Sequence, residues 1–207
     1  MSVSERVSNR VSRMKRGVPF SINGFYALGT HTSVQKAMSR LAKENTIERV
    51  SKGFYVRPKP LASIPSIKTT ASAEQVAEVW AREYGYTLVR QGQEAAYRLG
   101  LQTQAPIKVI FWSNGPSREF RIGNEVVQVR HITEKKLRWA GRPEGMLLRG
   151  LVVTPPESIE FSSILGAIKR LSLSREEALS VLHKLSEVSV LQGWRNKLQQ
   201  FEQQLAL

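Results

Sequence analysis

The sequence predicts an α+β protein in which an N-terminal winged helix-turn-helix is followed by a mixed α/β domain closed by C-terminal helices. An amphipathic helix pattern at 33–43 runs directly into a hairpin pattern, and two further helix patterns precede it. A Pro- and Ser-rich stretch follows, and alternating helix and strand patterns come after it. We therefore expect a winged-helix domain at 1–57, a linker at 58–70 and an α+β domain at 71–207.

The first two helices are marked by capping residues. Ser2 and Glu5 have the spacing of a capping box, so we expect a helix from about residue 3 to residue 14. Gly17 ends this helix, and Pro19 prevents an early restart. Ser21 is placed to cap a short second helix over 22–28.

The third helix has one apolar and one polar face. At 100° per residue, its apolar side chains fall within a single arc of about 140°. These are Val34, Ala37, Met38, Leu41 and Ala42. The opposite arc carries only polar side chains, which are Ser33, Gln35, Lys36, Ser39, Arg40 and Lys43. Two strand patterns follow, with Lys52 at their turn and Arg57 after the second.

This arrangement suits the recognition of double-stranded DNA. In the winged-helix plan the third helix enters the major groove, and the hairpin tip reaches a neighbouring phosphate or the minor groove. Glutamine can bind an adenine edge, arginine a guanine edge, and lysines suit phosphates. The predicted DNA-binding residues are Ser33, Gln35, Lys36, Ser39, Arg40, Lys43, Lys52 and Arg57.

The charge distribution favours a polyanionic partner at the N-terminal end. The formal net charge is +14 at pH 7 and the sequence pI is about 10.4. Residues 1–60 hold 12 Lys or Arg against 3 Glu, residues 61–150 hold 13 against 8, and residues 151–207 hold 6 against 6. The alternative interpretation is a generally solvated basic surface. Because the most basic part of the chain is also the part with the helix and hairpin, we favour a nucleic acid as the partner.

The sequence contains few of the residue types and motifs that enzyme active sites use. All 17 acidic residues are glutamates, whereas two-metal nucleases and nucleotidyltransferases usually recruit aspartate. Cysteine is absent, the three histidines lack metal-ligand spacing, and no phosphate-binding loop of the GxxxxGK[ST] type occurs. We expect no catalytic residue, metal or cofactor. With neither a membrane-spanning run nor a secretory signal in the sequence, we expect a cytoplasmic protein without a membrane partner.

The second domain is expected to alternate short helices and strands. Ser72 and Gln75 have capping-box spacing before a helix to about residue 84, and Gly123-Asn124 is a hairpin turn between strands 118–122 and 125–132. Three arginines of that hairpin are candidates for a second basic surface that contacts phosphates or an acidic protein, and the alternative interpretation is a solvated strand face. They are Arg118, Arg121 and Arg130. Helices at 155–171, 175–188 and 191–204 are expected to close the core.

Two stretches also resemble a known family. The first is "RGVPFSINGFYALGTHTSVQKAMSRLAKENTIERVSKGFYVRPK", with the helix from Val34 to Leu41 and the hairpin from Ile47 to Tyr55. The second is "GQEAAYRLGLQTQAP", followed by the turn at 115–118 and by the pair at 130–131. Together they resemble AbiEi-like antitoxins of type IV toxin–antitoxin (abortive infection) systems, over roughly residues 10–150. Family members have a glycine before the hairpin; here Asn45 is able to adopt the same left-handed turn.

The resemblance implies a DNA-binding repressor of its own operon, acting at sites such as inverted repeats upstream of it. It also implies that the protein counters a nucleotidyltransferase-like toxin, without requiring direct contact. Two alternatives stay open. One is a nucleic-acid-processing enzyme with its site in 70–150, where Glu119 and Glu125 are the clustered acids of the hairpin. The other is an RNA-binding or architectural protein that contacts phosphates without sequence preference.

Overall fold

A computed structural model describes residues 1–63 and 68–207. The chain divides into two compact units. The first comprises Met1–Tyr86 with Arg118–Val127, and the second comprises Thr87–Ser117 with Gln128–Leu207. No helix within the described ranges is both long enough and apolar enough to cross a membrane.

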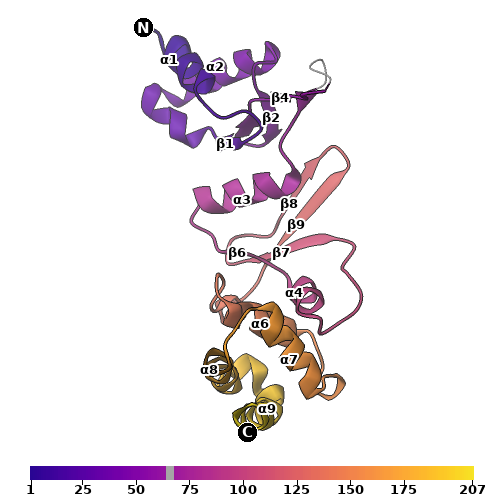
Figure 1. Cartoon of the computed structure of the whole chain (residues 1–207). Coiled ribbons are helices and arrows are strands. Elements are labelled where there is room, and N and C mark those ends of the chain that lie inside the picture. The colour runs from indigo at the N-terminus through magenta and orange to yellow at the C-terminus, as the bar shows by residue number, and fades with distance from the viewer. Residues whose placement is uncertain (64–67) are drawn as a thin grey trace. The chain divides into compact units, whose positions relative to one another are not determined.

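The first unit begins with a winged helix-turn-helix, as the sequence predicts (Figure 1). Its elements are, in order, α1 (Val3–Ser12), β1 (Pro19–Ser21), the 3-10 helix η1 (Asn23–Leu28), α2 (His31–Lys43), β2 (Glu48–Ser51) and β3 (Phe54–Val56). The three strands form an antiparallel sheet in the order β1-β3-β2. The hairpin β2–β3 is the wing, and α2 occupies the place of the recognition helix.

Local capping contacts explain most of these boundaries. The Ser2 hydroxyl and the Glu5 carboxylate form the expected capping box of α1. At α2 the Thr30 hydroxyl accepts a hydrogen bond from the Ser33 N–H, so this helix begins two residues earlier than the pattern predicts. Asn45 adopts φ +54°, the left-handed conformation expected of it, and Gly53 has φ +81° in the wing turn.

Apolar side chains from α1, α2 and the small sheet fill one core. Its fully or largely buried members are Val7, Val11, Phe20, Ile22, Phe25, Val34, Ala37, Met38, Leu41, Ile47 and Tyr55. The strand β1 was not anticipated from the sequence, because three residues are too few to show an alternating pattern. By pairing with β3 it fixes the wing to this core.

The structure differs from the expected linker at 58–70. Residues Lys59–Pro60 (β4) pair with Lys68–Thr69 (β5), and residues 64–67 lie outside the described ranges. Helix α3 (Ala73–Glu83) packs against β1 and against β8 (Arg118–Ile122). The Trp80 ring lies 5.6 Å from the Phe120 ring in this contact. Helix α3 and β8 therefore belong to the first unit, and the unit boundaries do not coincide with the expected domains.

The mixed sheet has the strand order β6-β7-β9-β8. Its other strands are β6 (Leu88–Arg90), β7 (Val109–Ser113) and β9 (Glu125–His131). Gly123 has φ +56° in the two-residue turn before β9, as the Gly-Asn pair predicts. The second unit adds α4 (Gly92–Leu99), α5 (Glu134–Leu137), α6 (Pro143–Val152), α7 (Phe161–Arg170), α8 (Arg175–Ser186) and α9 (Arg195–Ala206), with 3-10 segments η2 (Pro156–Ser158) and η3 (Ser189–Trp194).

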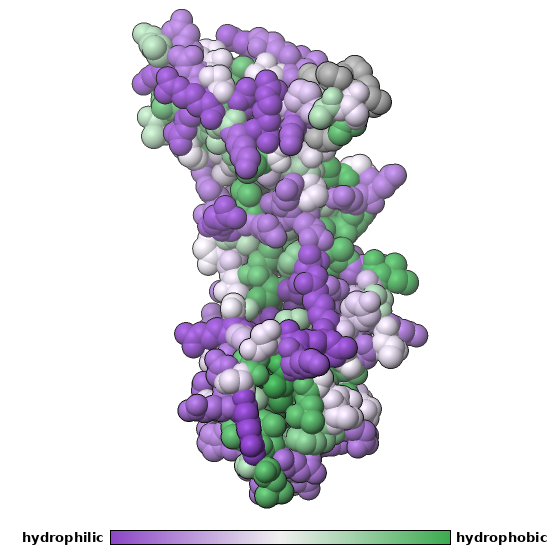
Figure 2. Space-filling model, in the orientation of Figure 1, coloured by the Kyte–Doolittle hydropathy of each residue, from purple (hydrophilic) through white to green (hydrophobic). Residues whose placement is uncertain are grey.

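The helices of the second unit surround a continuous apolar core. Leu147, Leu148 and Leu151 of α6 are fully buried in it, and the Trp194 indole N–H donates to the Leu151 carbonyl at 2.9 Å. The expected helix at 155–171 is divided, because Ile159 is extended between η2 and α7. In Figure 2 apolar side chains show among these C-terminal helices, whereas the visible face of the N-terminal helices is mostly hydrophilic.

Candidate nucleic-acid interface

Helix α2 is buried along one side and exposed along the other, as predicted. Val34 and Met38 have no exposed surface, and Leu41 is 7% exposed. After its first turn, the exposed side chains of the helix are those of Gln35, Lys36, Ser39, Arg40 and Lys43. Burial of the apolar arc holds the helix to the core and leaves its hydrogen-bonding groups facing solvent.

The exposed face has two distinct edges. Gln35 and Arg40 are five residues apart, which places them about 140° apart around the helix axis. Gln35 and Ser39 lie on the edge beside the wing, where they line a cavity with Lys52. Arg40 lies on the edge beside α1, where its guanidinium donates to the Ser4 hydroxyl at 3.2 Å. The two side chains proposed to read bases therefore do not lie next to each other.

Lysines occupy the middle of the face and the tip of the wing. At 100° per residue, Lys36 and Lys43 fall between the two edges of α2. Lys52 is exposed in the turn between β2 and β3. Within the described residues, none of these three ammonium groups forms an ion pair. Their charges are available to a polyanion.

Two of the predicted DNA-binding residues form contacts within the winged helix-turn-helix. The Ser33 hydroxyl lies 2.8 Å from the Thr30 hydroxyl, within the N-terminal cap of α2. The half-buried Arg57 guanidinium donates from Nη1 to the carbonyl oxygens of Ser12 at 2.6 Å and Met14 at 2.7 Å. Ser12 is the last residue of α1, where carbonyls lack an intrahelical partner, and Met14 lies two residues beyond it. Arg57 therefore anchors the end of α1, and its contact with DNA stays a prediction.

A cavity of about 690 Å³ opens beside α2 within the first unit. It is lined by η1, α2, the wing, the end of α3 and the start of β8. The lining residues are Ile22, Asn23, Tyr26, Gln35, Ser39, Ala42, Arg49, Lys52, Gly53, Tyr55, Tyr84 and Arg118. Three of them are cations and none is acidic. Of the predicted DNA-binding residues, this cavity gathers Gln35, Ser39 and Lys52.

Several lining residues were missed from the sequence. Arg49 was detectable, because it alternates with the buried Val50 on β2 and must point away from the core. Tyr84 gave no such signal, and Arg118 was predicted only as part of a second basic surface. They reach the cavity through the packing of α3 and β8, which no local pattern reveals.

The three arginines of the β8 hairpin do not form one surface. Arg118 and Phe120 share a face of β8, whereas Arg121 points to the opposite face because strand side chains alternate. Arg121 pairs with Glu119 at 3.0 Å. Arg130 donates to the Gln128 side chain at 3.3 Å. Arg118 thus lies in the cavity beside α2, whereas Arg121 pairs with Glu119, and a role of these arginines in phosphate binding stays a prediction.

The acids considered for an enzymatic site also have local partners. Glu119 is engaged by Arg121, and a Glu125 carboxylate oxygen accepts the Ala73 N–H at 3.0 Å, at the first residue of α3. An anion at a helix N-terminus stabilises the helix. In the part of the chain that the structure describes, no three metal-ligating side chains gather. Glu119 thus pairs within β8, and Glu125 joins the start of β9 to the start of α3.

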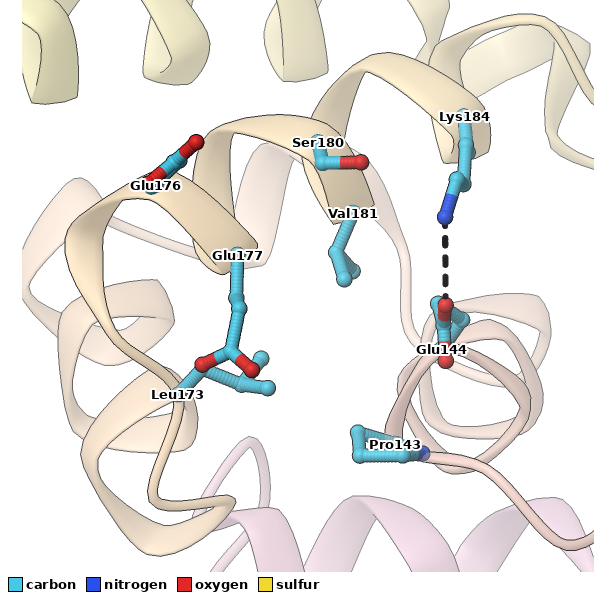
Figure 3. Close-up of a pocket in the computed structure, with 8 residues that line it drawn as sticks. All are labelled: Pro143, Glu144, Leu173, Glu176, Glu177, Ser180, Val181 and Lys184. Carbon is cyan, nitrogen blue, oxygen red and sulfur yellow. Dashed lines mark hydrogen bonds and ion pairs between the residues drawn. The ribbon is translucent and has the colours of Figure 1, made fainter.

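A further pocket of about 370 Å³ lies between α6 and α8 in the second unit (Figure 3). Lys184 and Glu144 face each other across it, with 3.4 Å between Nζ and Oε1. Glu177 completes the capping box of α8, where the backbone and side-chain hydrogen bonds with Ser174 lower its pKa. The charged groups of this pocket join and cap helices, so their geometry is accounted for without a ligand.

Comparison with known proteins gives a family and a structural likeness. A family model described as "Family of unknown function (DUF6088)" matches residues 6–175, and the chain belongs to this family. None of the curated proteins matches the chain. Among solved structures, the crystal structure of the RV2827C protein from Mycobacterium tuberculosis is similar at 14% identity and a TM-score of 0.45, covering 97% of this chain and 80% of that one.

Proposed function

We propose that this member of the DUF6088 family is a sequence-specific DNA-binding regulator that acts through α2 and the wing. One observation carries the proposal: α2 is buried on its apolar arc and presents Gln35, Lys36, Ser39, Arg40 and Lys43 to solvent, directly beside a wing tipped by Lys52. Such a face supplies both kinds of contact that duplex recognition needs. Amide and guanidinium groups bind base edges, and ammonium groups bind phosphates.

The biological role in this proposal comes from the resemblance to AbiEi-like antitoxins. The protein represses its own operon in the cytoplasm and counters a nucleotidyltransferase-like toxin encoded with it. Direct contact with the toxin is not required. The left-handed Asn45 supports the resemblance at the one position where this sequence departs from the family pattern, because the backbone there adopts the conformation that glycine would provide.

Binding of the full chain to the DNA upstream of its own gene tests the regulator. Fluorescence anisotropy is measured at three salt concentrations, with a scrambled duplex as competitor. We expect binding about 10³-fold tighter or more to the upstream DNA. Equal and steeply salt-dependent binding to both duplexes would contradict sequence-specific regulation and favour a phosphate-binding RNA or architectural protein.

A matched pair of charge variants locates the interface. Lys36→Gln removes a charge from the exposed face of α2, and Lys108→Gln removes one from an exposed position in the second unit. We expect Lys36→Gln to lower the slope of log K against log salt by about one, and Lys108→Gln to leave it unchanged. Repression of a reporter gene and rescue of growth from the toxin then test the antitoxin role. If the protein binds its operator but does not rescue growth, the antitoxin role is contradicted.

A further inference from the structure

The cavity beside α2 is unusual in the sign of its charges. Arg49, Lys52 and Arg118 line it without any carboxylate. Arg49 and Lys52 extend from the wing, and within the described residues neither forms an ion pair. A cleft lined by charges of one sign concentrates the field and attracts the opposite charge. Its occupant is therefore expected to be anionic.

Arg118 is held in place by groups that leave its charge uncompensated. Its guanidinium lies over the Phe120 ring at 5.0 Å and near the Trp80 ring at 5.9 Å. Its Nη2 donates to the Ser51 hydroxyl at 3.3 Å. These contacts fix the orientation of the Arg118 guanidinium, and all of the contacting groups are neutral. The geometry of a planar, oriented guanidinium suits an oxyanion such as a phosphate.

Aromatic rings and amides line the rest of the cavity. Tyr26 is stacked on His31 with 3.8 Å between ring centroids, so its orientation is fixed, and Tyr84 is 50% exposed. The exposed part of the Tyr84 ring is of the kind that stacks on nucleobases. Asn23 and Gln35 add amide groups, which donate and accept hydrogen bonds at a base edge. The lining thus offers partners to both parts of a nucleotide.

We propose that this cavity binds a nucleoside phosphate. The phosphate lies against Arg49, Lys52 and Arg118, and the base lies against the tyrosines with an amide at its edge. The volume of about 690 Å³ is within the range of small-molecule sites. The proposal does not depend on DNA binding, since it is tested by direct binding of a free nucleotide.

Occupation of the cavity has a consequence for the proposed DNA interface. Gln35, Ser39 and Lys52 belong both to the cavity lining and to the predicted DNA-binding set. A nucleotide that engages these groups competes with duplex DNA for them, so ligand and DNA should each weaken the binding of the other by the same factor. The site would make repression responsive to a soluble nucleotide.

Isothermal titration calorimetry of the full chain with AMP, GMP, CMP and UMP tests the site. Adenosine and inorganic phosphate serve as probes for the base and for the phosphate alone. We expect at least one nucleotide to bind about tenfold or more tightly than either fragment, because only the whole molecule reaches both the cations and the rings. Binding of inorganic phosphate as tight as that of every nucleotide would overturn the role of the rings.

Two Arg→Gln variants on the same strand supply the matched control. Arg118→Gln is expected to weaken nucleotide binding about tenfold or more, and Arg121→Gln, three residues away on the opposite face, to change it less than twofold. Lys52→Gln in the exposed wing turn provides a second cavity variant that leaves the core intact. Equal effects of Arg118→Gln and Arg121→Gln would indicate general charge attraction and overturn the proposal.

The same variants separate a free nucleotide from a phosphate of bound DNA. If no nucleotide binds at millimolar concentration while Arg118→Gln weakens duplex binding, the proposal is overturned and the cavity belongs to the DNA backbone contact. If a nucleotide binds and no duplex does, the nucleotide site stands and the proposed regulator fails. The two proposals therefore fail independently.

Discussion

The Arg57 guanidinium donates a hydrogen bond to the Met14 carbonyl at 2.7 Å and so joins the end of α1 to the chain that leaves the wing. A second bond, to the Ser12 carbonyl at 2.6 Å, comes from the same nitrogen. Ser12 is the last residue of α1 and Met14 follows the helix, so the guanidinium lies at the helix C-terminus, where the helix dipole also favours a positive charge. This geometry predicts that Arg57 stabilises the fold.

The first prediction follows from this contact. Arg57→Gln should lower the free energy of unfolding by about 1–3 kcal/mol, because charge-assisted hydrogen bonds at partly buried carbonyls are lost. Urea denaturation followed by circular dichroism measures the change. Arg49→Gln is the control: Arg49 is an exposed arginine of the wing and should change stability by less than about 0.5 kcal/mol. Equal losses in the two variants would contradict the anchoring role.

The second prediction concerns the two edges of α2. Gln35 and Arg40 are about 7.5 Å apart along the helix and about 140° apart around it, so they should contact different base pairs. Gln35→Ala and Arg40→Ala should each cost about 1–3 kcal/mol at the cognate site and relax base preference at separate positions. A binding-site selection with each variant measures this. Relaxation at the same position in both would show that the edges are not read separately.

The third prediction tests the buried side of the same helix. Leu41 is 7% exposed and packs in the core of the winged-helix region. Leu41→Ala should lower the free energy of unfolding by about 2–5 kcal/mol through lost burial and a cavity. The exposed Lys43→Ala, two residues further along α2, should change it by less than about 0.5 kcal/mol. A chemical denaturation series measures both, and a loss below about 1 kcal/mol in Leu41→Ala would refute tight packing there.

Local patterns predicted α2 well because its determinants lie close together in the sequence. The 3.6-residue period specifies which arc is buried, and the caps of α1, α3 and α8 each need only a Ser and an acid or amide three residues later. The left-handed turn at Asn45 is equally local. Such features are determined by a few neighbouring residues and do not depend on the rest of the fold.

Contacts between distant segments escaped the same reasoning. The Arg57 contact with the Ser12 carbonyl spans 45 positions, and the Arg118 contact with the Ser51 hydroxyl spans 67. For an arginine that follows a strand, the sequence does not distinguish a phosphate contact from a helix anchor, because the partner lies far away in the chain. For the same reason the cavity beside α2 was invisible in the sequence, since its lining comes from five separate segments.

The fourth prediction concerns Arg149 of α6, which is 5% exposed and whose Nε and Nη1 have no hydrogen-bond partner among the described residues. Burial lowers the pKa of Arg149 to about 10, so at pH 7 the group remains charged without compensation. Arg149→Met removes this charge and keeps an unbranched apolar stem. We expect it to raise the free energy of unfolding by about 1–4 kcal/mol. Arg82→Met, at an exposed position of α3, should change it by less than about 0.5 kcal/mol.

The pH dependence separates a lost charge from improved packing. The folded-state pKa of Arg149 lies below its unfolded value, so the unfolded chain binds more protons between the two values and wild-type stability gains from this group as the pH rises past about 10. Arg149→Met lacks this gain. The difference between variant and wild type should therefore be constant from pH 6 to 9 and shrink above about pH 10, as measured by urea midpoints. A difference that persists unchanged at high pH would mean that packing is the cause, and a destabilised Arg149→Met would mean that the guanidinium has a compensating anion.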